Sequence, residues 1–229
     1  MGRETHSSQR LETSPEIPAN ASASANALSR PVRVAQPHES STLKIALGAA
    51  FFDDPIFAWL IGPGSSRQAR VDRYFAIQLA HSFADGHVWT VDGLHGAALC
   101  MPPGHWRLPP TLMIAHGASF TNVFRGRLPR AVGLLTAIER RHLRGAHYYF
   151  ANIGVAPEAQ GHGLGSRLMR PTLDRCDEEQ LPAYLEASSE RNAALYERLG
   201  FHTTEVLRFA GSPPLRLMMR PPEPRPPTT

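Results

Sequence analysis

The sequence predicts a mixed α/β domain in which helices cover a central sheet. The second half carries the clearest pattern: a strand, a glycine-rich turn, a helix, a short strand, another helix and two closing strands between 147 and 220. The first half has helical patterns on either side of two short strands, which Gly93 joins by a turn. Strands and helices interleaved in this order form a covered sheet, and 229 residues with 42% hydrophobic side chains suit one such domain.

In the first half, apolar residues recur at helical spacing over 42–52, and Pro55 is expected to end that helix. A second helix is expected over 65–83, ahead of the stop signal Gly86. Two strands and two further helices are predicted at 87–92, 95–101, 111–124 and 127–144.

In the second half, the aromatic and β-branched run 147–155 predicts a strand. A helix over 164–179 follows the glycine-rich turn, and Pro171 is expected to kink it without ending it. Ser189 and Gly200 are cap candidates for a helix at 190–199. The remaining strands are predicted at 182–186, 201–209 and 214–220.

The two ends of the chain look unlike the middle. Residues 1–40 hold hardly any large apolar side chain, so we expect a disordered N-terminal tail. Residues 221–229 are rich in proline and are expected to be loose, which leaves 41–220 as the folded domain. No apolar run reaches the roughly 20 residues of a membrane span, and no secretory signal is visible, so a cytoplasmic protein is expected. The histidines and the two cysteines show no metal-ligand spacing, so no metal is expected.

The turn Gln160–Gly165 carries the clearest chemical signal. Three glycines in five positions let the backbone approach a ligand closely, and the free N–H groups of the following helix lie beside them. Such a turn suits a phosphate or pyrophosphate. Its residue order fits neither a P-loop nor a dinucleotide fingerprint, and a glycine-rich connection without a ligand is the alternative.

The neighbourhood of this turn supports a ligand. The pattern Gln160-x-x-Gly163-x-Gly165, after a strand ending Ile153-Gly154-Val155, resembles the acyl-CoA signature of the GNAT superfamily of N-acetyltransferases. Two later segments resemble the second half of that fold: Leu185-Glu186-Ala187-Ser188 and Tyr196-Glu197-Arg198-Leu199-Gly200-Phe201. Their residues are most similar to the motifs of the puromycin N-acetyltransferase branch. The specific resemblance covers about 147–201. It implies a mostly antiparallel sheet with helices on both faces and a splayed strand at the acyl-CoA site.

The resemblance also implies acetyl-CoA as the co-substrate. Its pyrophosphate would bind the turn, and backbone N–H groups of the splayed strand would align the thioester carbonyl, with Gly154 allowing a bulge. His162 stands where many relatives have Arg or Lys. The implied cofactor contacts are Ile153, Gly154, Val155, Gln160, Gly161, His162, Gly163, Leu164, Gly165, Ser166 and Asn192.

Two residues are candidates for proton transfer. The resemblance assigns Tyr196 as the general acid for the leaving thiolate, and the alternative is a half-buried aromatic that fixes a helix to the sheet. Glu186 is the candidate general base for the amine, and the alternative is a surface carboxylate. Tyr148, Tyr149 and His147 are candidates to line the acceptor pocket, and because side chains alternate along a strand, Tyr148 and Tyr149 are expected to point to opposite faces, so that at most one of them reaches the pocket.

These residues favour transfer of an acetyl group from acetyl-CoA to the amine of a small molecule, such as an aminonucleoside, another amine antibiotic or a metabolite. The alternatives are a protein or peptide acceptor, another acyl group, and a CoA-binding module without turnover. A monomer or homodimer is expected, without nucleic acid and without a membrane. Six arginines against Glu139 give the segment 120–146 a charge of +5. These arginines are expected to form a solvated face, and the alternative is a basic rim for the CoA phosphates.

Overall fold

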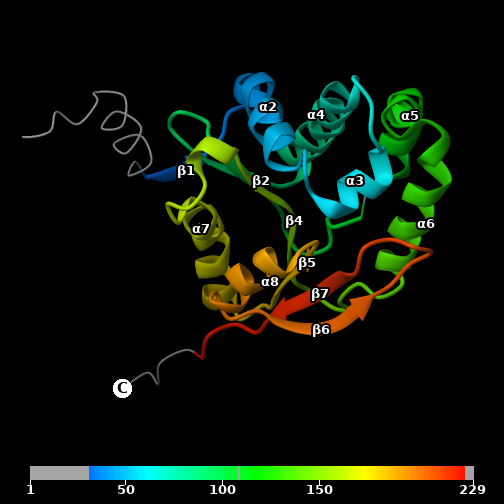
Figure 1. Cartoon of the computed structure of the whole chain (residues 1–229). Helices are drawn as coiled ribbons and strands as arrows, with labels where there is room; N and C mark the ends of the chain where they lie inside the picture. Colours follow the sequence, from blue (N-terminus) through cyan, green and yellow to red (C-terminus); the bar gives the residue numbers. More distant parts are fainter. Residues whose placement is uncertain (1–30, 108, 225–229) are drawn as a thin grey trace, which may run out of the picture.

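The computed structural model describes residues 31–107 and 109–224. Seven strands form one sheet in the order β1-β2-β3-β4-β5-β7-β6 (Figure 1). All neighbouring strands are antiparallel except β4 and β5, which run parallel. The predicted mixed and mostly antiparallel α/β fold is therefore confirmed.

The elements occur in the predicted order, with β1 and α3 in addition. The strands are β1 (Val32–Val34), β2 (His87–Val91), β3 (Gly96–Met101), β4 (Tyr148–Val155), β5 (Ala183–Ala187), β6 (His202–Leu207) and β7 (Leu215–Arg220). The helices are α2 (Ser40–Ala50), α3 (Pro55–Ile61), α4 (Arg67–Asp85), α5 (Pro110–Phe124), α6 (Leu128–Glu139), α7 (Leu164–Glu179) and α8 (Glu190–Glu197). Short 3₁₀ turns lie at Pro37–Glu39, Arg125–Arg127 and Pro157–Ala159.

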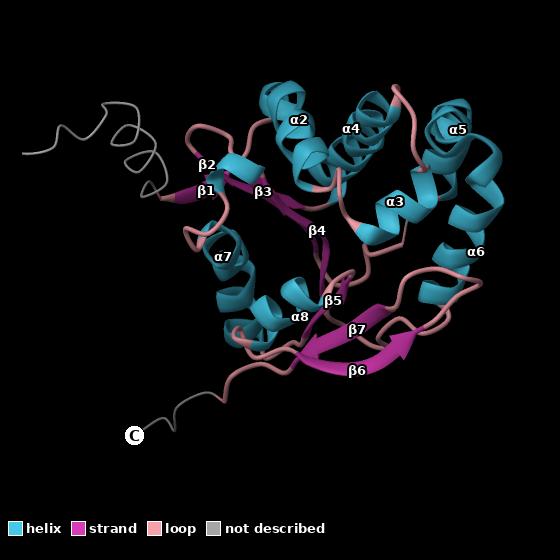
Figure 2. Cartoon of the chain, viewed as in Figure 1, coloured by secondary structure: helices cyan, strands magenta, loops and turns pink. Residues whose placement is uncertain are grey.

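Helices cover both faces of the sheet, as Figure 2 shows. Helices α2 and α4 pack on one face over β2, β3 and β4, and α7 packs on the opposite face of the same strands. Helix α7 continues past Pro171, and its apolar face is buried. Its buried members are Leu164, Leu168, Thr172 and Cys176. None of the helices in the described ranges is long and apolar enough to cross a bilayer.

Strand β4 carries its irregularity at Ala151. Opposite β3, Leu99 pairs with Asn152 whereas Cys100 pairs with Phe150, so Ala151 is the extra residue of a bulge. The expectation of a bulge at Gly154 is therefore wrong. At Gly154 a Cβ atom would lie 2.8 Å from the Leu47 side chain of α2, so this glycine permits α2 to pack directly on the strand.

The prediction that Pro55 ends a helix is also wrong, because Pro55 begins α3. The Asp54 side chain accepts hydrogen bonds from the backbone N–H groups of Ile56 and Phe57, at 2.9 Å and 3.0 Å. An acidic N-cap followed by proline at the first helical position is a start signal. The sequence contains this start signal, and at the first helical position proline favours a helix although it breaks one further along.

The folded region extends beyond the predicted limits of 41 and 220. Strand β1 pairs with β2, and Arg33 of β1 binds Glu39 and Asp92, each at 2.7 Å. The expectation of a disordered tail up to residue 40 is thus wrong for 32–39, while 1–30 lie outside the described residues. At the other end, the Glu223 backbone N–H donates to Asp177 at 2.7 Å, so 221–224 are not loose; residues 225–229 are not described. Helix α6 ends at Glu139, five residues before the predicted end.

Candidate active site

The parallel strands β4 and β5 separate soon after they meet. They share only two residue pairs, Tyr148 with Ala183 and Tyr149 with Tyr184. Beyond these pairs β4 stays beside β3 as far as Val155, and β5 stays beside β7. A gap therefore opens in the middle of the sheet, and both strand edges along it lack a strand partner.

The backbone of β4 presents hydrogen-bonding groups to this gap. The Ala156 N–H donates to the His95 carbonyl oxygen at 2.8 Å, on the β3 side. Because backbone groups alternate along a strand, the N–H groups of Ile153 and Val155 point to the gap and that of Gly154 points to β3. Two of the three expected backbone contacts thus have the orientation that a ligand in the gap requires.

The glycine-rich turn lies at the open end of the gap. Gly161 and Gly163 have φ angles of 86° and 72°, a left-handed conformation that favours glycine. Gly163 is the N-cap of α7 and offers no side chain, so the first N–H groups of the helix are open to a ligand. Gln160 fastens the turn by donating from Nε2 to the Val155 carbonyl oxygen at 3.0 Å. His162 is exposed in the same turn.

Helix α8 brings Asn192 and Tyr196 to the opposite side of the gap. The Ser189 hydroxyl caps the helix by accepting from the Asn192 N–H at 3.2 Å, as predicted. Asn192 and Tyr196 lie one turn apart and both line the central cavity. Tyr196 is 6% exposed, and burial together with the charge of Asp54 raises the pKa of its phenol. The phenol therefore stays protonated at neutral pH.

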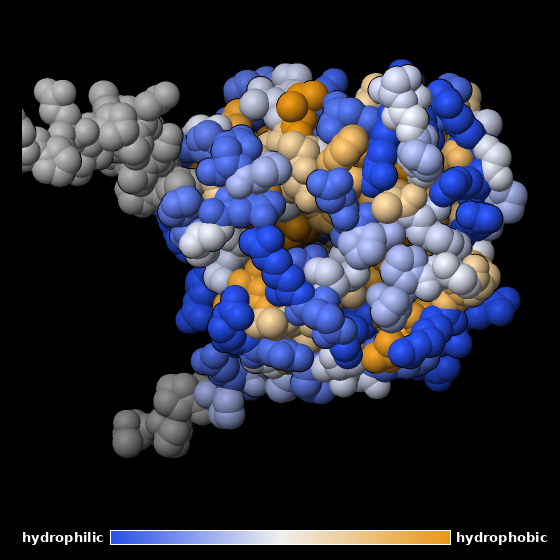
Figure 3. Space-filling model, viewed as in Figure 1, coloured by the Kyte–Doolittle hydropathy of each residue, from blue (hydrophilic) through white to orange (hydrophobic). Residues whose placement is uncertain are grey.

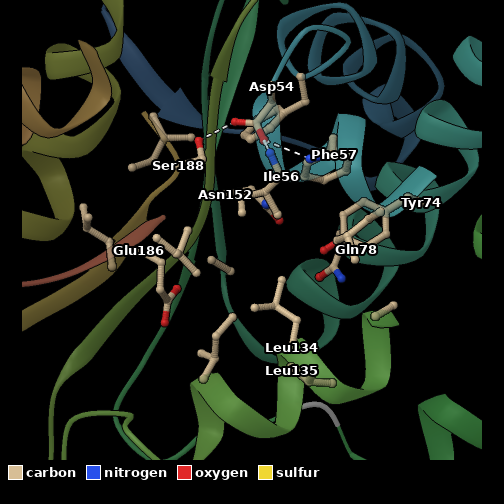
Figure 4. A pocket seen from close by; sticks show the side chains of 18 of the residues that line it. Asp54, Ile56, Phe57, Tyr74, Gln78, Leu134, Leu135, Asn152, Glu186 and Ser188 are labelled. Atoms are coloured by element: carbon tan, nitrogen blue, oxygen red, sulfur yellow. Dashed lines mark hydrogen bonds between the residues drawn. The ribbon is translucent and has the colours of Figure 1, made fainter. Parts of the chain in front are cut away.

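Asp54 is a site residue that sequence reasoning missed. Besides capping α3, its carboxylate accepts a hydrogen bond from the Ser188 hydroxyl, which Figure 4 shows as a dashed line. Ser188 in turn lies 3.4 Å from the Asn192 side-chain nitrogen. Asp54 thus connects α3 to the turn between β5 and α8, and burial raises the pKa of its carboxyl group.

A cavity of about 230 Å³ extends from the gap to α5 and α6. The walls that α3, α5 and α6 supply are apolar, whereas Tyr74 and Gln78 of α4 add polar groups (Figure 4). The space-filling view shows a hollow near the middle of the displayed face, with apolar residues at the bottom (Figure 3). The apolar wall residues from α3, α5 and α6 are Ile56, Phe57, Leu60, Phe120, Phe124, Leu128, Ala131, Val132, Leu134, Leu135 and Ile138.

Glu186 of β5 lies at the sheet end of this cavity, and its side chain is 9% exposed. The alternative of a surface carboxylate therefore does not describe it. The Tyr149 hydroxyl donates to Oε2 at 2.8 Å. Burial raises the pKa of Glu186 to about 7, and the hydrogen bond from Tyr149 opposes that shift.

The two tyrosines of β4 point to opposite faces, as their alternation predicted. Tyr149 contacts Glu186 and lines the cavity. The Tyr148 hydroxyl instead donates to Glu179 of α7 at 2.9 Å, on the other face of the sheet. Only Tyr149 of the pair therefore reaches the cavity.

Comparison with known proteins assigns the family. The sequence model of the acetyltransferase (GNAT) family matches residues 100–201. An uncharacterized N-acetyltransferase of Schizosaccharomyces pombe is 30% identical over 193 residues, which are 76% of this chain and 76% of the relative. The chain belongs to the GNAT family of acetyltransferases.

Solved structures agree with this GNAT fold. One, of a histone acetyltransferase HPA2 and related acetyltransferase from Corynebacterium glutamicum, has a TM-score of 0.65 and 26% identity, covering 88% of this chain and 99% of the other. The polyamine N-acetyltransferase of Drosophila melanogaster has a TM-score of 0.54 at 18% identity, covering 82% and 96%. The arylalkylamine N-acetyltransferase 2 of Aedes aegypti has a TM-score of 0.54 at 12% identity, covering 84% and 99%. The last two show the fold alone.

The basic segment of this GNAT protein lies away from the glycine-rich turn. Helix α6 contacts α3 and α5, whereas α7 contacts β1 to β4, and Figure 1 shows the two helices at opposite sides of the molecule. Arg127 donates to the Trp59 carbonyl oxygen at 2.7 Å and Arg141 binds Glu205 at 2.8 Å. The segment therefore does not lie beside the glycine-rich turn, and the basic rim for the CoA phosphates stays an untested alternative. Within the described ranges, no group of three potential metal ligands occurs.

Proposed function

We propose that this GNAT protein transfers an acetyl group from acetyl-CoA to the primary amine of a small molecule whose body is apolar. The observation that carries the proposal is the cavity between the splayed strands and α5–α6. Among its described lining residues the only charged side chains are Asp54 and Glu186, both acidic and both near the sheet. An ammonium group is attracted to that end, and the apolar remainder of the molecule matches the far walls.

The gap between β4 and β5 suits the acyl-CoA arm. The N–H groups of Ile153 and Val155 would hold amide and carbonyl oxygens, and the open start of α7 with Gly161 and Gly163 would bind the pyrophosphate. Asn192 would contact the same arm from α8. The unpaired strand edges support this assignment, because backbone groups left without a partner favour a ligand that supplies one.

The two candidate proton-transfer groups have complementary protonation states. Acetyl-CoA supplies the acetyl group as a thioester, which the neutral amine attacks directly. Glu186, whose pKa is about 7, takes one proton from the ammonium group to make that amine. Tyr196, protonated at neutral pH, supplies a proton to the departing thiolate as the carbon–sulfur bond breaks. The second amine proton returns Tyr196 to its phenol form, so one proton per turnover stays on Glu186.

The apolar wall narrows the acceptor class. A diamine or guanidine would place a second cation against α5 and α6, where the described lining offers no carboxylate. Burying an unpaired charge is costly. We therefore expect monoamines with an aromatic or aliphatic body, and an aminonucleoside, as the puromycin-branch resemblance suggests, would fit only where its amine is attached to an aromatic or aliphatic group.

The test is release of free thiol from acetyl-CoA with an amine panel. Phenethylamine, hexylamine and an aminonucleoside should be turned over with a kcat/KM at least ten times that of putrescine, agmatine or a peptide with a free N-terminus. Preference for the peptide would establish the protein-acceptor alternative instead. Binding of acetyl-CoA in calorimetry without thiol release from any amine would establish a non-catalytic CoA-binding module.

A further inference from the structure

Two buried histidines lie behind Glu186, outside the cavity that would hold the amine. His142 is in the loop between α6 and β4, and His147 immediately precedes β4; they are 6% and 1% exposed. The His142 ring stacks on Trp106, with centroids 3.7 Å apart and an interplanar angle of 13°. It also packs edge-on against Tyr149 and Tyr184. This packing fixes the position of the His142 ring.

The protonated nitrogen of each ring follows from its partners. The His147 Nδ1 lies 2.8 Å from the Gly145 carbonyl oxygen, which can only accept, so Nδ1 carries the hydrogen. Burial lowers the pKa of both histidines, that of His142 to about 3, so both rings are neutral. His147 therefore has a bare Nε2. That atom lies 3.0 Å from the His142 Nε2, which must donate to it.

The remaining nitrogen of His142 is consequently a bare acceptor, and it faces Glu186. The His142 Nδ1 lies 3.7 Å from the Glu186 Oε1. Both atoms are buried and neither has a hydrogen-bond partner. A bare imidazole nitrogen repels a carboxylate oxygen and accepts a hydrogen bond from a carboxylic acid. The pair is therefore complementary when Glu186 is protonated.

We propose that His142 is a positioning residue for Glu186: its bare Nδ1 holds the proton of the neutral carboxyl group on Oε1, and the Gly145 carbonyl imposes this tautomer through His147. This role rests on the proposed function, in which Glu186 keeps one proton per turnover. No group is oxidised or reduced. The proton moves from the ammonium nitrogen to Glu186 and is later released to solvent.

Other titratable groups also face this pair. Tyr149 donates to Oε2 of Glu186, and the Tyr184 hydroxyl also lies close enough to interact with this carboxyl group and lower its pKa. The charge of Glu186 in turn raises the pKa values of Tyr74 and Tyr184. Arg107 lies near His142 and, with burial and His147, disfavours its charged form. The tyrosine hydroxyls can stabilise the carboxylate by donating to it. His142 is the group of this set whose facing atom only accepts.

The first experiment reads the tautomers without any substrate. Nitrogen-15 NMR of the full-length protein labelled at histidine should show His142 with hydrogen on Nε2 and His147 with hydrogen on Nδ1. In His147→Phe the acceptor for the His142 Nε2–H is lost, so the His142 Nδ1–H tautomer should gain population. The exposed His202 serves as a reference. A His142 that carries its hydrogen on Nδ1 in the wild-type protein, or is charged at pH 7, would overturn the proposal.

The second experiment uses His142→Phe, which keeps a ring against Trp106 and removes the acceptor. The protonated form of Glu186 loses the bare nitrogen that faces Oε1 and favours the neutral carboxyl group, so the apparent pKa on the acidic limb of kcat should fall by about half to one pH unit. His202→Phe, on the exposed face of β6, should leave that limb unchanged. An unchanged acidic limb in a folded His142→Phe protein would overturn the role of His142.

The two proposals fail in distinguishable ways. If no amine is turned over, the proposed function fails, while the tautomers of His142 and His147 and an infrared titration of the Glu186 carboxyl group still test the positioning role. If His142→Phe does not fold, His147→Phe replaces it. A His142 that then donates from Nδ1 should also lower the pKa of Glu186, because it stabilises the carboxylate. No fall in that variant would contradict the proposal.

Discussion

Tyr149 of β4 belongs to the last residue pair between β4 and β5, and its hydroxyl donates a 2.8 Å hydrogen bond to Glu186 of β5, two residues beyond that pair. The bond spans the start of the gap and holds the candidate base beside the edge that would receive the thioester. It also connects the two halves of the sheet where backbone pairing ends.

Replacing Tyr196 by phenylalanine should lower kcat roughly 100-fold and leave the Kd for acetyl-CoA almost unchanged, because only the acidic proton is removed. Stopped-flow thiol release and calorimetric binding measure the two quantities. Tyr148→Phe is the matched control, since its hydroxyl contacts Glu179 on the other face of the sheet. Parallel losses of kcat and affinity in Tyr196→Phe would indicate a structural tyrosine instead.

The stability effect of Glu186→Gln should depend on pH. Burial raises the pKa of Glu186 from 4.5 to about 7, so between these values the folded protein binds a proton that the unfolded chain has released. Wild-type stability therefore decreases as pH rises through this window, by roughly 3 kcal/mol in total. Glutamine cannot ionise, so the Tm of the variant relative to wild type should rise between pH 5 and pH 8.

Thermal unfolding followed by circular dichroism measures this difference. Glu197→Gln is the matched control, because Glu197 lies exposed at the end of α8. A Tm difference for Glu186→Gln that stays constant from pH 5 to pH 8 would show that Glu186 is not protonated in the folded protein near neutrality. Glu186→Gln should also lose the acidic limb of the plot of kcat against pH.

Two substitutions at Gly163 can separate the effect of charge at the proposed anion site from the effect of backbone strain. A Cβ atom there meets nothing within 4 Å, so alanine and glutamate incur the same left-handed strain of roughly 1–2 kcal/mol. Only glutamate adds a negative charge at the start of α7. We expect the KM for acetyl-CoA to rise at least tenfold more in Gly163→Glu than in Gly163→Ala. Equal KM values for the two variants would show that the pyrophosphate does not bind at this turn.

Because α2 packs closely on β4, a side chain introduced at Gly154 should lower the stability of the fold. A Cβ atom there would lie 2.8 Å from Leu47 and 2.9 Å from Phe51, so Gly154→Ala should destabilise the fold by about 1–3 kcal/mol. Gly117→Ala in α5, where nothing lies within 4 Å, should instead be neutral or slightly stabilising. Urea unfolding measures both, and similar stabilities for the two variants would contradict the packing argument.

Local signals in the sequence predicted much of the fold. Helix α7 has the predicted bounds because its glycine cap and its apolar face both lie within one short segment. Strand β4 followed equally well from aromatic and β-branched residues. Asp54–Pro55 shows that a local signal can also be misread, since the same proline is a breaker inside a helix and a favoured residue at its start.

The rest depends on contacts between distant segments. The bulge at Ala151 arises from the pairing of β4 with β3, and no property of Ala151 itself announces it. His142 reaches Glu186 across 44 positions in the sequence, through packing on Trp106. The turn and Tyr196 could be named from the sequence because a family pattern contains them. The acceptor cavity could not, because α3, α5 and α6 form it together.

Strand β1 sets the N-terminal limit that a shortened protein must keep in order to stay free of aggregation. Its three residues cover the outer side of β2, and Arg33 secures them to Asp92 beyond the end of β2 and to Glu39 ahead of α2. A protein shortened to residue 41 would leave the N–H and C=O groups of β2 as a bare edge. Such edges recruit strands from other molecules. Ten residues that contain no candidate catalytic group would then decide whether the acetyltransferase domain aggregates.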